Sequence, residues 1–403
     1  MRSKLEFQSD RIEAVLSLHK IPARVTGGTV TPRWVRFQVL PALGVKIAKI
    51  KRLSEELAAA LDARSCRVSR RGAAVDVEIP RDDPQPVRLL PLFRQLHDIR
   101  TGTVRAHPGT SGRQPARANV PPVTAVLGLA EDGAPLLIRL PSPDVAHILV
   151  AGTTGSGKTV LLQAMILSLA MTNPAPCQRL GGEQGGLALV LVDPKGHAFR
   201  LFEDLPHLVR PVIREMQEAV EALQSLVRLM ERRSVPSSGL MGSEPLQGQP
   251  QVALVVDELA DLLMVGGKPM REALTRLTQR GREAGIHVIA ATQKPTSAVL
   301  GPLVKANFPV RLCGRVTSAE DARTATGWSG TGAERLLGRG DFLAVAEGRV
   351  IRFQAAHVAP AEVRDVVAQL ARDDVSGETW SPEPVRRLAA MSADVAVDIS
   401  EGV

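Results

Sequence analysis

The most chemically specific residues of this sequence lie in one short stretch, "HILVAGTTGSGKTV", which begins at His147. Its spacing fits GxxxxGK[ST], a pattern in which glycines let successive backbone N–H groups face phosphate oxygens. A strand is predicted before this loop and a helix after it, and the N-terminus of the helix adds positive potential. The stretch therefore predicts an ATP-binding loop formed by Gly152, Thr153, Thr154, Gly155, Ser156, Gly157, Lys158 and Thr159.

Two acids downstream are expected to complete this site. We expect Lys158 to bridge the β- and γ-phosphates and Thr159 to give its hydroxyl to Mg²⁺. The apolar run "VALVVDELADLL" ends in Asp257 and Glu258, and parallel strands deliver their C-terminal residues to one edge of a sheet. Asp257 is expected to hold the Mg²⁺ shell and Glu258 to polarise the attacking water, which predicts ATP hydrolysis. The alternative is that both acids only cap the next helix.

A third strand, "HVIAATQ", ends in Thr292 and Gln293. We expect the Gln293 amide to hydrogen-bond the γ-phosphate or its attacking water, at the same edge of the sheet. The alternative is a polar strand end with no special role.

Apolar strands alternate with helical patterns over residues 123–358. Continuous apolar strands separated by helices indicate a parallel sheet that is covered on both faces. We therefore predict an α/β fold in this region: a RecA-like P-loop ATPase domain with a mainly parallel sheet.

Three further segments are expected around this domain. Residues 1–100 combine short helices and strands and predict a small, basic α+β module. Residues 101–122 are rich in Gly, Pro, Ser and Arg, which predicts a linker or mobile loop. Residues 359–403 are polar and weakly patterned, and we expect them to form a short C-terminal tail.

Charge and hydropathy narrow the class of protein. The formal net charge is +8, with an excess of about eleven positive charges before residue 120 and about minus three after it. This distribution favours a nucleic-acid partner, although a solvated basic face is the alternative. No apolar run reaches about 18 residues, and the N-terminus lacks the apolar segment of a secretory signal. The expectation is a cytoplasmic protein without a membrane segment.

The order of motifs resembles one family. The run "HILVAGTTGSGKTV", "LVDPKG", "LMERR", "VALVVDELADLL", "GREAGIHVIAATQKP", "VKANFPVRL", "DARTATG" and "GAERLLGRGDFL" is similar to the motor domain of the FtsK/SpoIIIE double-stranded DNA translocases. The segment "TPRWVRFQVLPALGVKIAKIKRLSEELAAALDA" resembles the module that precedes this motor in the family. The resemblance implies a homohexameric ring that hydrolyses ATP between subunits and moves duplex DNA through its centre.

The resemblance also implies roles for basic residues. Arg282, which precedes "AGIH", matches the position of an arginine finger offered to a neighbouring subunit, with Arg280 as the second choice. Each would otherwise be a solvated arginine at a helix C-terminus. Three basic residues match pore or pore-adjacent positions and are candidates for DNA contact: Lys294, Lys305 and Arg323. Very low aromatic content argues against stacking on single strands and favours tracking of the duplex backbone.

Two other classes of function stay open from the sequence. Type VII secretion ATPases resemble the same motor fold, so a protein-transport motor is the leading alternative. An inactive nucleic-acid-binding scaffold is a third hypothesis, and the presence of Lys158 and Glu258 counts against it. The family's membrane helices and C-terminal winged helix are not evident, which suggests a plasmid or mobile-element transfer motor that uses an unidentified loading partner.

Overall fold

The structure, a computed structural model, describes residues 2–101, 120–176, 186–234, 249–295 and 307–376. Its contacts divide the chain into two compact units. The first comprises Met1–Val87 together with Glu131–Ala134, and the second comprises Arg88–Ala130 and Pro135–Val403. The short segment Glu131–Ala134 is the tip of a hairpin whose strands belong to the second unit.

The first unit is an antiparallel sheet packed against helices. Its four strands have the order β1-β2-β4-β3. Alternate strand residues such as Phe37 and Val77 face a core that also contains Ile12 and Leu16 of the first helix. The elements are α1 (Arg2–Leu18), β1 (Ala23–Val30), β2 (Trp34–Pro41), α2 (Ile47–Arg52), α3 (Ser54–Ala60), β3 (Arg67–Arg71) and β4 (Ala74–Pro80).

The residues between these apolar positions carry buried charge. Arg36 lies opposite Glu78 in the β2–β4 register, and its Nε donates to Glu78 Oε1 at 2.9 Å. Arg36 also pairs with Asp76 at 3.6 Å and with Glu131 at 3.6 Å. Glu131 accepts in turn from Arg67 at 3.3 Å. A buried charge is tolerated only where such partners surround it, so the three carboxylates of Glu78, Asp76 and Glu131 account for the position of Arg36 inside the unit.

The second unit contains a mixed nine-stranded sheet with the order β6-β5-β13-β12-β11-β7-β10-β9-β8. The five strands from β11 to β8 are parallel to one another, and the other four pair antiparallel. The strands are β5 (Thr124–Ala130), β6 (Pro135–Arg139), β7 (Ile148–Ala151), β8 (Leu187–Val192), β9 (Gln251–Val256), β10 (Ile286–Thr292), β11 (Val310–Cys313), β12 (Asp341–Ala346) and β13 (Arg349–Ala355).

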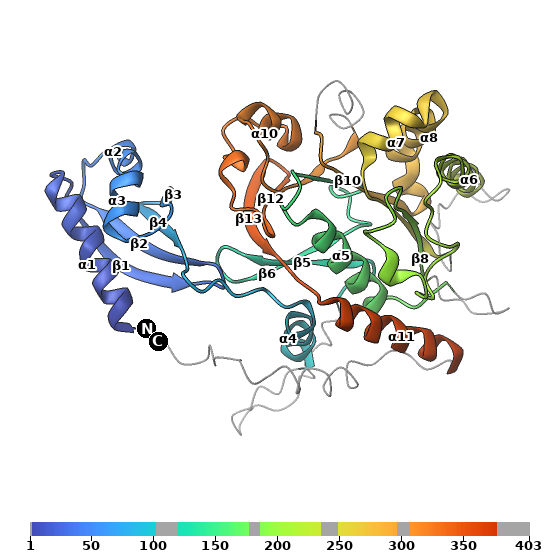
Figure 1. The fold of residues 1–403 in the computed structure, drawn as a ribbon, viewed down its shortest axis with the longest axis horizontal. Helices are drawn as coiled ribbons and strands as arrows, with labels where there is room; N and C mark the ends of the chain where they lie inside the picture. Colours follow the sequence, from blue (N-terminus) through green and yellow to red (C-terminus); the bar gives the residue numbers. More distant parts are fainter. Residues whose placement is uncertain (1, 102–119, 177–185, 235–248, 296–306, 377–403) are drawn as a thin grey trace, which may run out of the picture. The chain divides into compact units, whose positions relative to one another are not determined.

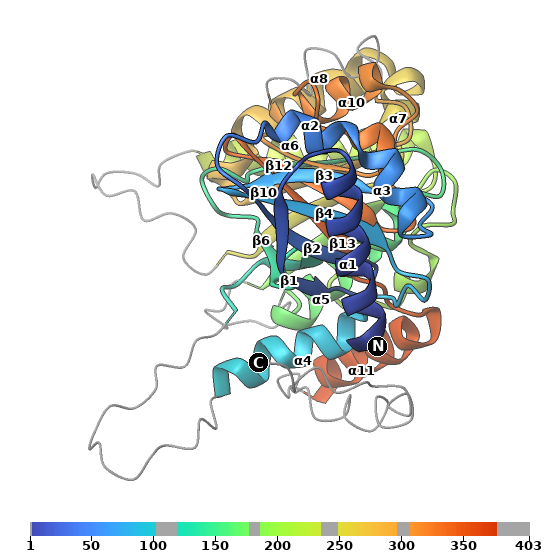
Figure 2. The same ribbon diagram turned by 90° about the vertical axis from the view of Figure 1, so that its left-hand side faces the viewer.

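Helices bury the parallel strands. Helices α6, α7 and α8 share a core with alternate residues of β8, β9 and β10. Both views place α4 and α11 side by side, on the other side of α5 from α7 and α8 (Figures 1 and 2). The helices are α4 (Leu89–Thr101), α5 (Lys158–Thr172), α6 (Met216–Ser234), α7 (Leu259–Val265), α8 (Gly267–Arg280), α10 (Ala319–Thr326) and α11 (Pro360–Ser376), with short 3₁₀ turns η1 (Arg200–Phe202), η2 (Gly281–Ala284) and η3 (Ala333–Arg335).

The predicted fold class is confirmed: a P-loop-type α/β unit follows a small α+β unit. The parallel strands are β7 to β11, where apolar strands alternate with helices in sequence, whereas the antiparallel strands lie at the two sequence ends of the unit. Helix α11 lies in the segment expected to be a weakly patterned tail. Its buried Val363, Val366, Val367 and Leu370 have helical spacing. Among the described residues, no helix is both long and apolar enough to cross a membrane.

Candidate nucleotide site

The phosphate-loop motif joins β7 to α5 as the sequence predicts. The three motif glycines, Gly152, Gly155 and Gly157, have φ values of +152°, +77° and +103°. L-residues rarely adopt such values, so the loop can fold this way only with glycine at these positions. Gly157 is also close to a neighbouring segment, because a Cβ there would lie 2.7 Å from the backbone nitrogen of Gly340.

Two segments, one just after β11 and one just before β12, form hydrogen bonds with the backbone of the phosphate loop. The carbonyl oxygen of Arg315, just after β11, accepts from the N–H of Thr153 at 2.8 Å and from its hydroxyl at 3.0 Å. The N–H groups of Arg339 and Gly340 donate to the carbonyl oxygens of Gly155 and Ser156 at 2.9 and 2.7 Å. The bonds from Arg339 and Gly340 hold two loop carbonyl oxygens, and the bond to Arg315 holds the N–H of Thr153, so the loop is fixed from both sides.

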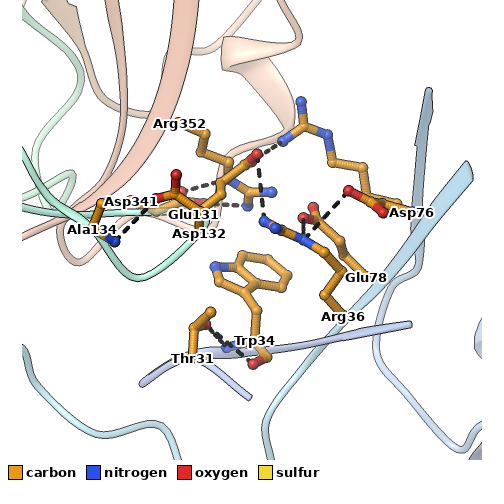
Figure 3. Close-up of polar contacts among 11 residues, drawn as sticks. Thr31, Trp34, Arg36, Asp76, Glu78, Glu131, Asp132, Ala134, Asp341 and Arg352 are labelled. Atoms are coloured by element: carbon orange, nitrogen blue, oxygen red, sulfur yellow. Dashed lines mark hydrogen bonds and ion pairs between the residues drawn. The ribbon is translucent and has the colours of Figure 1, made fainter. Parts of the chain in front are cut away.

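A buried ion pair fixes the turn that carries Gly340. Asp341, at the start of β12, accepts from the guanidinium of Arg352 on β13 through Nε–Oδ1 and Nη2–Oδ2, both 2.8 Å (Figure 3). The same carboxylate accepts from the Leu337 N–H at 2.9 Å, which closes the turn. Both charged side chains are almost fully buried, at 1% and 5% exposed. The pair therefore determines where the turn lies against the phosphate loop.

Lys158 lies in the first turn of α5 and folds over the loop. Its ammonium donates to the carbonyl oxygens of Gly152 at 2.6 Å and Thr153 at 3.1 Å. Burial lowers the pKa of Lys158, against the opposite effects of the charges on Glu258 and Asp257. Thr159, half-buried, follows it in the same turn.

Asp257 follows β9 at the same edge of the sheet. Its pKa is raised to about 6, first by burial and then by the nearby negative charges of Asp193 and Glu258, against the opposite effects of Lys158 and Lys195. Asp257 supplies a carboxylate oxygen, a ligand that Mg²⁺ prefers, and a cation there would offset the negative charges of Asp193 and Glu258. Asp257 therefore fits a magnesium ion, to which Thr159 in the first turn of α5 would add a hydroxyl.

Glu258 has an unusual backbone and a fixed side chain. It precedes α7 with φ +72° and ψ +68°, a left-handed conformation that costs a non-glycine residue on the order of 1–3 kcal/mol. Its carboxylate, 3% exposed, accepts from the Thr292 hydroxyl at 3.0 Å and from the Gln293 N–H at 3.1 Å. The ends of β9 and β10 are thus joined through the carboxylate that we expect to act on water.

Gln293 lies between Glu258 and the phosphate loop. Its side-chain Oε1 accepts from the Thr154 hydroxyl at 2.8 Å. The preceding residue, Thr292, also contacts the phosphate loop, because its carbonyl oxygen accepts from the Gly152 N–H at 3.2 Å. The structure therefore brings together the phosphate loop, Asp257, Glu258 and Gln293, which come from the ends of β7, β9 and β10.

Sequence reasoning assigned no role to two residues of this site. Asp193 follows β8 and is fully buried, and its carboxylate accepts from the N–H groups of Gly196, Ala198 and Phe199 at 2.7–3.1 Å. These bonds shape the loop that places Lys195 beside Glu258, at 3.7 Å, and Asp261, at 3.3 Å. The signal was present: "DPKG" follows an apolar strand at the same sheet edge as Asp257.

The pKa of Lys195 reflects this position. Partial burial acts to lower it, but the hydrogen bond to Asp261 and the charge of Glu258 outweigh that effect, so the pKa is raised. Lys195 is therefore a charged group at neutral pH and sits directly against two carboxylates.

The predicted arginine finger lies elsewhere in the unit. Arg282 is in η2 and Arg280 ends α8, both exposed and both before β10, whereas the phosphate loop lies at the other end of the parallel strands. Seven strand residues of about 3.3 Å each separate the two edges by roughly 20 Å. Neither arginine belongs to the nucleotide site of its own chain.

Of the three DNA-contact candidates, the structure describes Lys294 and Arg323, which come from different elements. Lys294 is exposed just beyond β10, and its backbone N–H donates to the Thr292 hydroxyl at 3.2 Å. Arg323 is exposed on α10. Lys305 lies outside the described residues.

Two family models match the chain. The model of the FtsK/SpoIIIE family matches residues 111–241 and 239–297, and that of the FtsK alpha domain matches residues 1–81. The chain is 32% identical to a DNA translocase FtsK of Staphylococcus epidermidis over 99% of this chain and 48% of that protein. It is 33% identical to the DNA translocase FtsK of Bacillus cereus over 89% of this chain and 44% of that protein. The chain thus spans about half the length of these curated relatives.

Solved structures share the fold. The monomer form of the pCW3 conjugation coupling protein TcpA with ATPγS has a TM-score of 0.52 at 19% identity, over 89% of this chain and 99% of that one. The cytoplasmic domain of the Thermomonospora curvata type VII secretion ATPase EccC has a TM-score of 0.51 at 27% identity, over 64% of this chain and 33% of that one.

Proposed function

Because the chain belongs to the FtsK/SpoIIIE family, we propose that it hydrolyses ATP with Mg²⁺ and uses the energy to move along double-stranded DNA. One observation carries the proposal. The phosphate loop, Glu258 and Gln293 come from different strands and meet at one sheet edge, as hydrolysis requires. A site that only stored the nucleotide would not need a carboxylate held there.

Thr159 and Asp257 are the residues that would hold the magnesium ion. When bound, the ion neutralises charge on the β- and γ-phosphate oxygens. A cation would also relieve the repulsion that raises the pKa of Asp257, so metal binding and full ionisation of this carboxylate favour each other.

Lys158, Glu258 and Gln293 have different roles in hydrolysis. Lys158 must leave the carbonyl oxygens of Gly152 and Thr153 to reach the β- and γ-phosphates, and the exchange replaces neutral acceptors by charged ones. Glu258 takes the proton of the attacking water. Gln293 can exchange its bond with Thr154 for one with the γ-phosphate or that water, which links the phosphate to the end of β10.

The DNA partner and the ring are the wider part of the proposal. A motor that ignores sequence grips phosphates with cations, a role that we assign to Lys294, Lys305 and Arg323. A hexameric ring brings a neighbouring subunit's Arg282 to each site, where its charge stabilises the transferring phosphoryl group. The position of Arg282 away from its own site is compatible with such a donation to another subunit.

A protein-transport motor is the second candidate, and one observation favours it. The EccC ATPase is 27% identical over 64% of this chain. In this hypothesis the same ATP site drives movement of a polypeptide, and duplex DNA has no effect on hydrolysis.

The deciding experiment measures ATP hydrolysis against the concentration of duplex DNA. We expect duplex DNA to accelerate hydrolysis and the protein to displace a triplex-forming strand from its duplex. Glu258→Gln is the matched inactive variant: it should bind nucleotide but lose hydrolysis by about 10²- to 10⁴-fold, the usual contribution of a general base. Lys158→Ala should lose nucleotide binding.

The outcomes separate the candidates. Hydrolysis that DNA does not accelerate, together with no triplex displacement, would reject the translocase. If a secretion-substrate peptide then accelerated hydrolysis, the transport motor would replace it. Full activity in Lys158→Ala would reject the site itself.

A further inference from the structure

The two carboxylate oxygens of Glu258 have different surroundings. Oε1 accepts from the Thr292 hydroxyl at 3.0 Å and the Gln293 N–H at 3.1 Å. A carboxylate oxygen offers two lone pairs, so these donors occupy Oε1 fully. The same N–H reaches Oε2 only at 3.3 Å. Oε2 is therefore the oxygen that remains to receive a proton from water.

Lys195 lies against this remaining oxygen. Its ammonium is 3.7 Å from Glu258 Oε2 and 3.3 Å from Asp261 Oδ2. Glu258 precedes α7 and Asp261 lies in the first turn of that helix, so the lysine bridges two carboxylates on one short segment. Its side chain is 45% exposed, whereas that of Glu258 is 3% exposed. Lys195 is thus the partner of Glu258 that can move with the least loss of packing.

The loop that carries Lys195 is itself fixed. The Asp193 carboxylate accepts three backbone N–H groups of residues 196–199, so the base of the lysine stays in place while its exposed end can rotate. The strained backbone of Glu258 persists only because such contacts over-determine it. The position of the carboxylate is therefore set, and what varies is the cation next to Oε2.

We infer that Lys195 is a positioning residue that restrains hydrolysis by sharing its charge between Glu258 and Asp261. While it lies against Oε2, this oxygen is a poorer acceptor for a proton. When the lysine moves entirely to Asp261, Oε2 is free. The water oxygen then bonds to the γ-phosphorus, and the bond between that phosphorus and the β–γ bridging oxygen breaks. The bridging oxygen keeps the electron pair and leaves as part of ADP, the water proton passes to Oε2, and inorganic phosphate is the second product. This inference rests on the proposed ATP hydrolysis.

The test uses variants that we expect to change kcat in opposite directions, and kcat is measured in the full chain without DNA. Lys195→Met removes the charge at similar length, and we expect kcat to rise by about threefold to tenfold with KM for ATP unchanged. Asp261→Asn leaves the lysine with Glu258 alone, so kcat should fall by a similar factor. The double variant, Lys195→Met with Asp261→Asn, should have the same kcat as Lys195→Met alone. Lys195→Arg should restore most of the restraint.

Lys268→Met is the matched control, because Lys268 is also an exposed cation paired with a carboxylate, Glu272 at 3.7 Å, but lies on α8. It should leave kcat unchanged. A kcat for Lys195→Met that is unchanged, or that falls toward that of Glu258→Gln, would overturn the inference and leave the proposed function intact. A wild-type chain without hydrolysis, with or without DNA, would reject the proposed function and this inference together.

Discussion

The backbone N–H of Gly340 donates to the carbonyl oxygen of Ser156 at 2.7 Å, and this bond joins the turn before β12 to the phosphate loop. Gly340 has a φ of +91°, a left-handed value that favours glycine, and a Cβ there would lie 2.5 Å from the side-chain amide nitrogen of Gln354. The buried pair of Asp341 and Arg352 holds the turn that Gly340 belongs to. Nucleotide affinity should depend on residues that never touch the nucleotide.

Loss of the Asp341 carboxylate should weaken nucleotide binding. In Asp341→Ala the turn loses the acceptor for the Leu337 N–H, and Arg352 is left buried without its anion. We expect the free energy of unfolding to fall by about 3–5 kcal/mol and the Kd for a fluorescent ATP analogue to rise about tenfold.

A double variant separates stability from positioning. Asp341→Leu with Arg352→Met replaces the buried pair by apolar side chains, which usually recovers most of the stability. The Kd should stay raised, because the Leu337 N–H still lacks its acceptor. Recovery of both quantities would mean that the pair serves only the stability of the unit.

The acid stability of the protein should depend on two buried histidines. The Val288 N–H donates to His147 Nδ1 at 3.0 Å, and His287 Nε2 lies 3.0 Å from Gln251 Oε1. Burial lowers the pKa of His147 to about 3, helped by the charge of His287, and burial lowers the pKa of His287 to about 4. Between pH 6.5 and about 4 the unfolded chain therefore binds protons that the folded chain does not.

Because the unfolded chain binds these protons and the folded chain does not, the free energy of unfolding should fall as the pH drops from 6.5 to about 4. The expected fall is about 1.4 kcal/mol per pH unit for each histidine. Urea unfolding at a series of pH values measures it. His287→Gln should remove one histidine's share of the slope. An equal slope in wild type and His287→Gln would contradict the assignment.

Arg282 should act only on a neighbouring subunit. We expect Arg282→Ala to lose ATP hydrolysis while it keeps nucleotide affinity, because its own site lies at the other sheet edge. Mixing it with Lys158→Ala, itself inactive, should recover part of the activity, since some sites then combine an intact Lys158 with an intact Arg282. If Arg282→Ala alone hydrolysed ATP at the normal rate, Arg282 would not be the arginine finger, and Arg280 would become the candidate.

Lys294 and Arg323 should matter for DNA and not for ATP. In Lys294→Ala with Arg323→Ala we expect the DNA-free rate of hydrolysis to be unchanged and DNA stimulation to fall. The slope of log affinity for DNA against log salt concentration should shrink by about one per lost phosphate contact. Arg228→Ala, which removes an exposed arginine on α6, is the control. A salt slope equal to that of the wild type would exclude both residues from the DNA surface.

Short sequence patterns predicted much of the fold because the physical constraints behind them act between residues that are close in the sequence. The phosphate loop needs glycine at fixed spacings, and apolar strands that end in acids need a buried parallel sheet. The antiparallel strands and α11 were harder to predict, because β13 pairs with β5 from far away in sequence and a single amphipathic helix in a polar tail gives a weak signal.

Residue type and position at a strand end are enough to indicate which residues could bind phosphate and which could act on water. The groups that surround these residues are known from the folded chain alone. The Gly340 turn behind the loop, the Thr292 hydroxyl on Glu258 and the ammonium of Lys195 beside it come from segments far apart in the chain. Their contacts arise from strand order and loop shape, which no local spacing encodes.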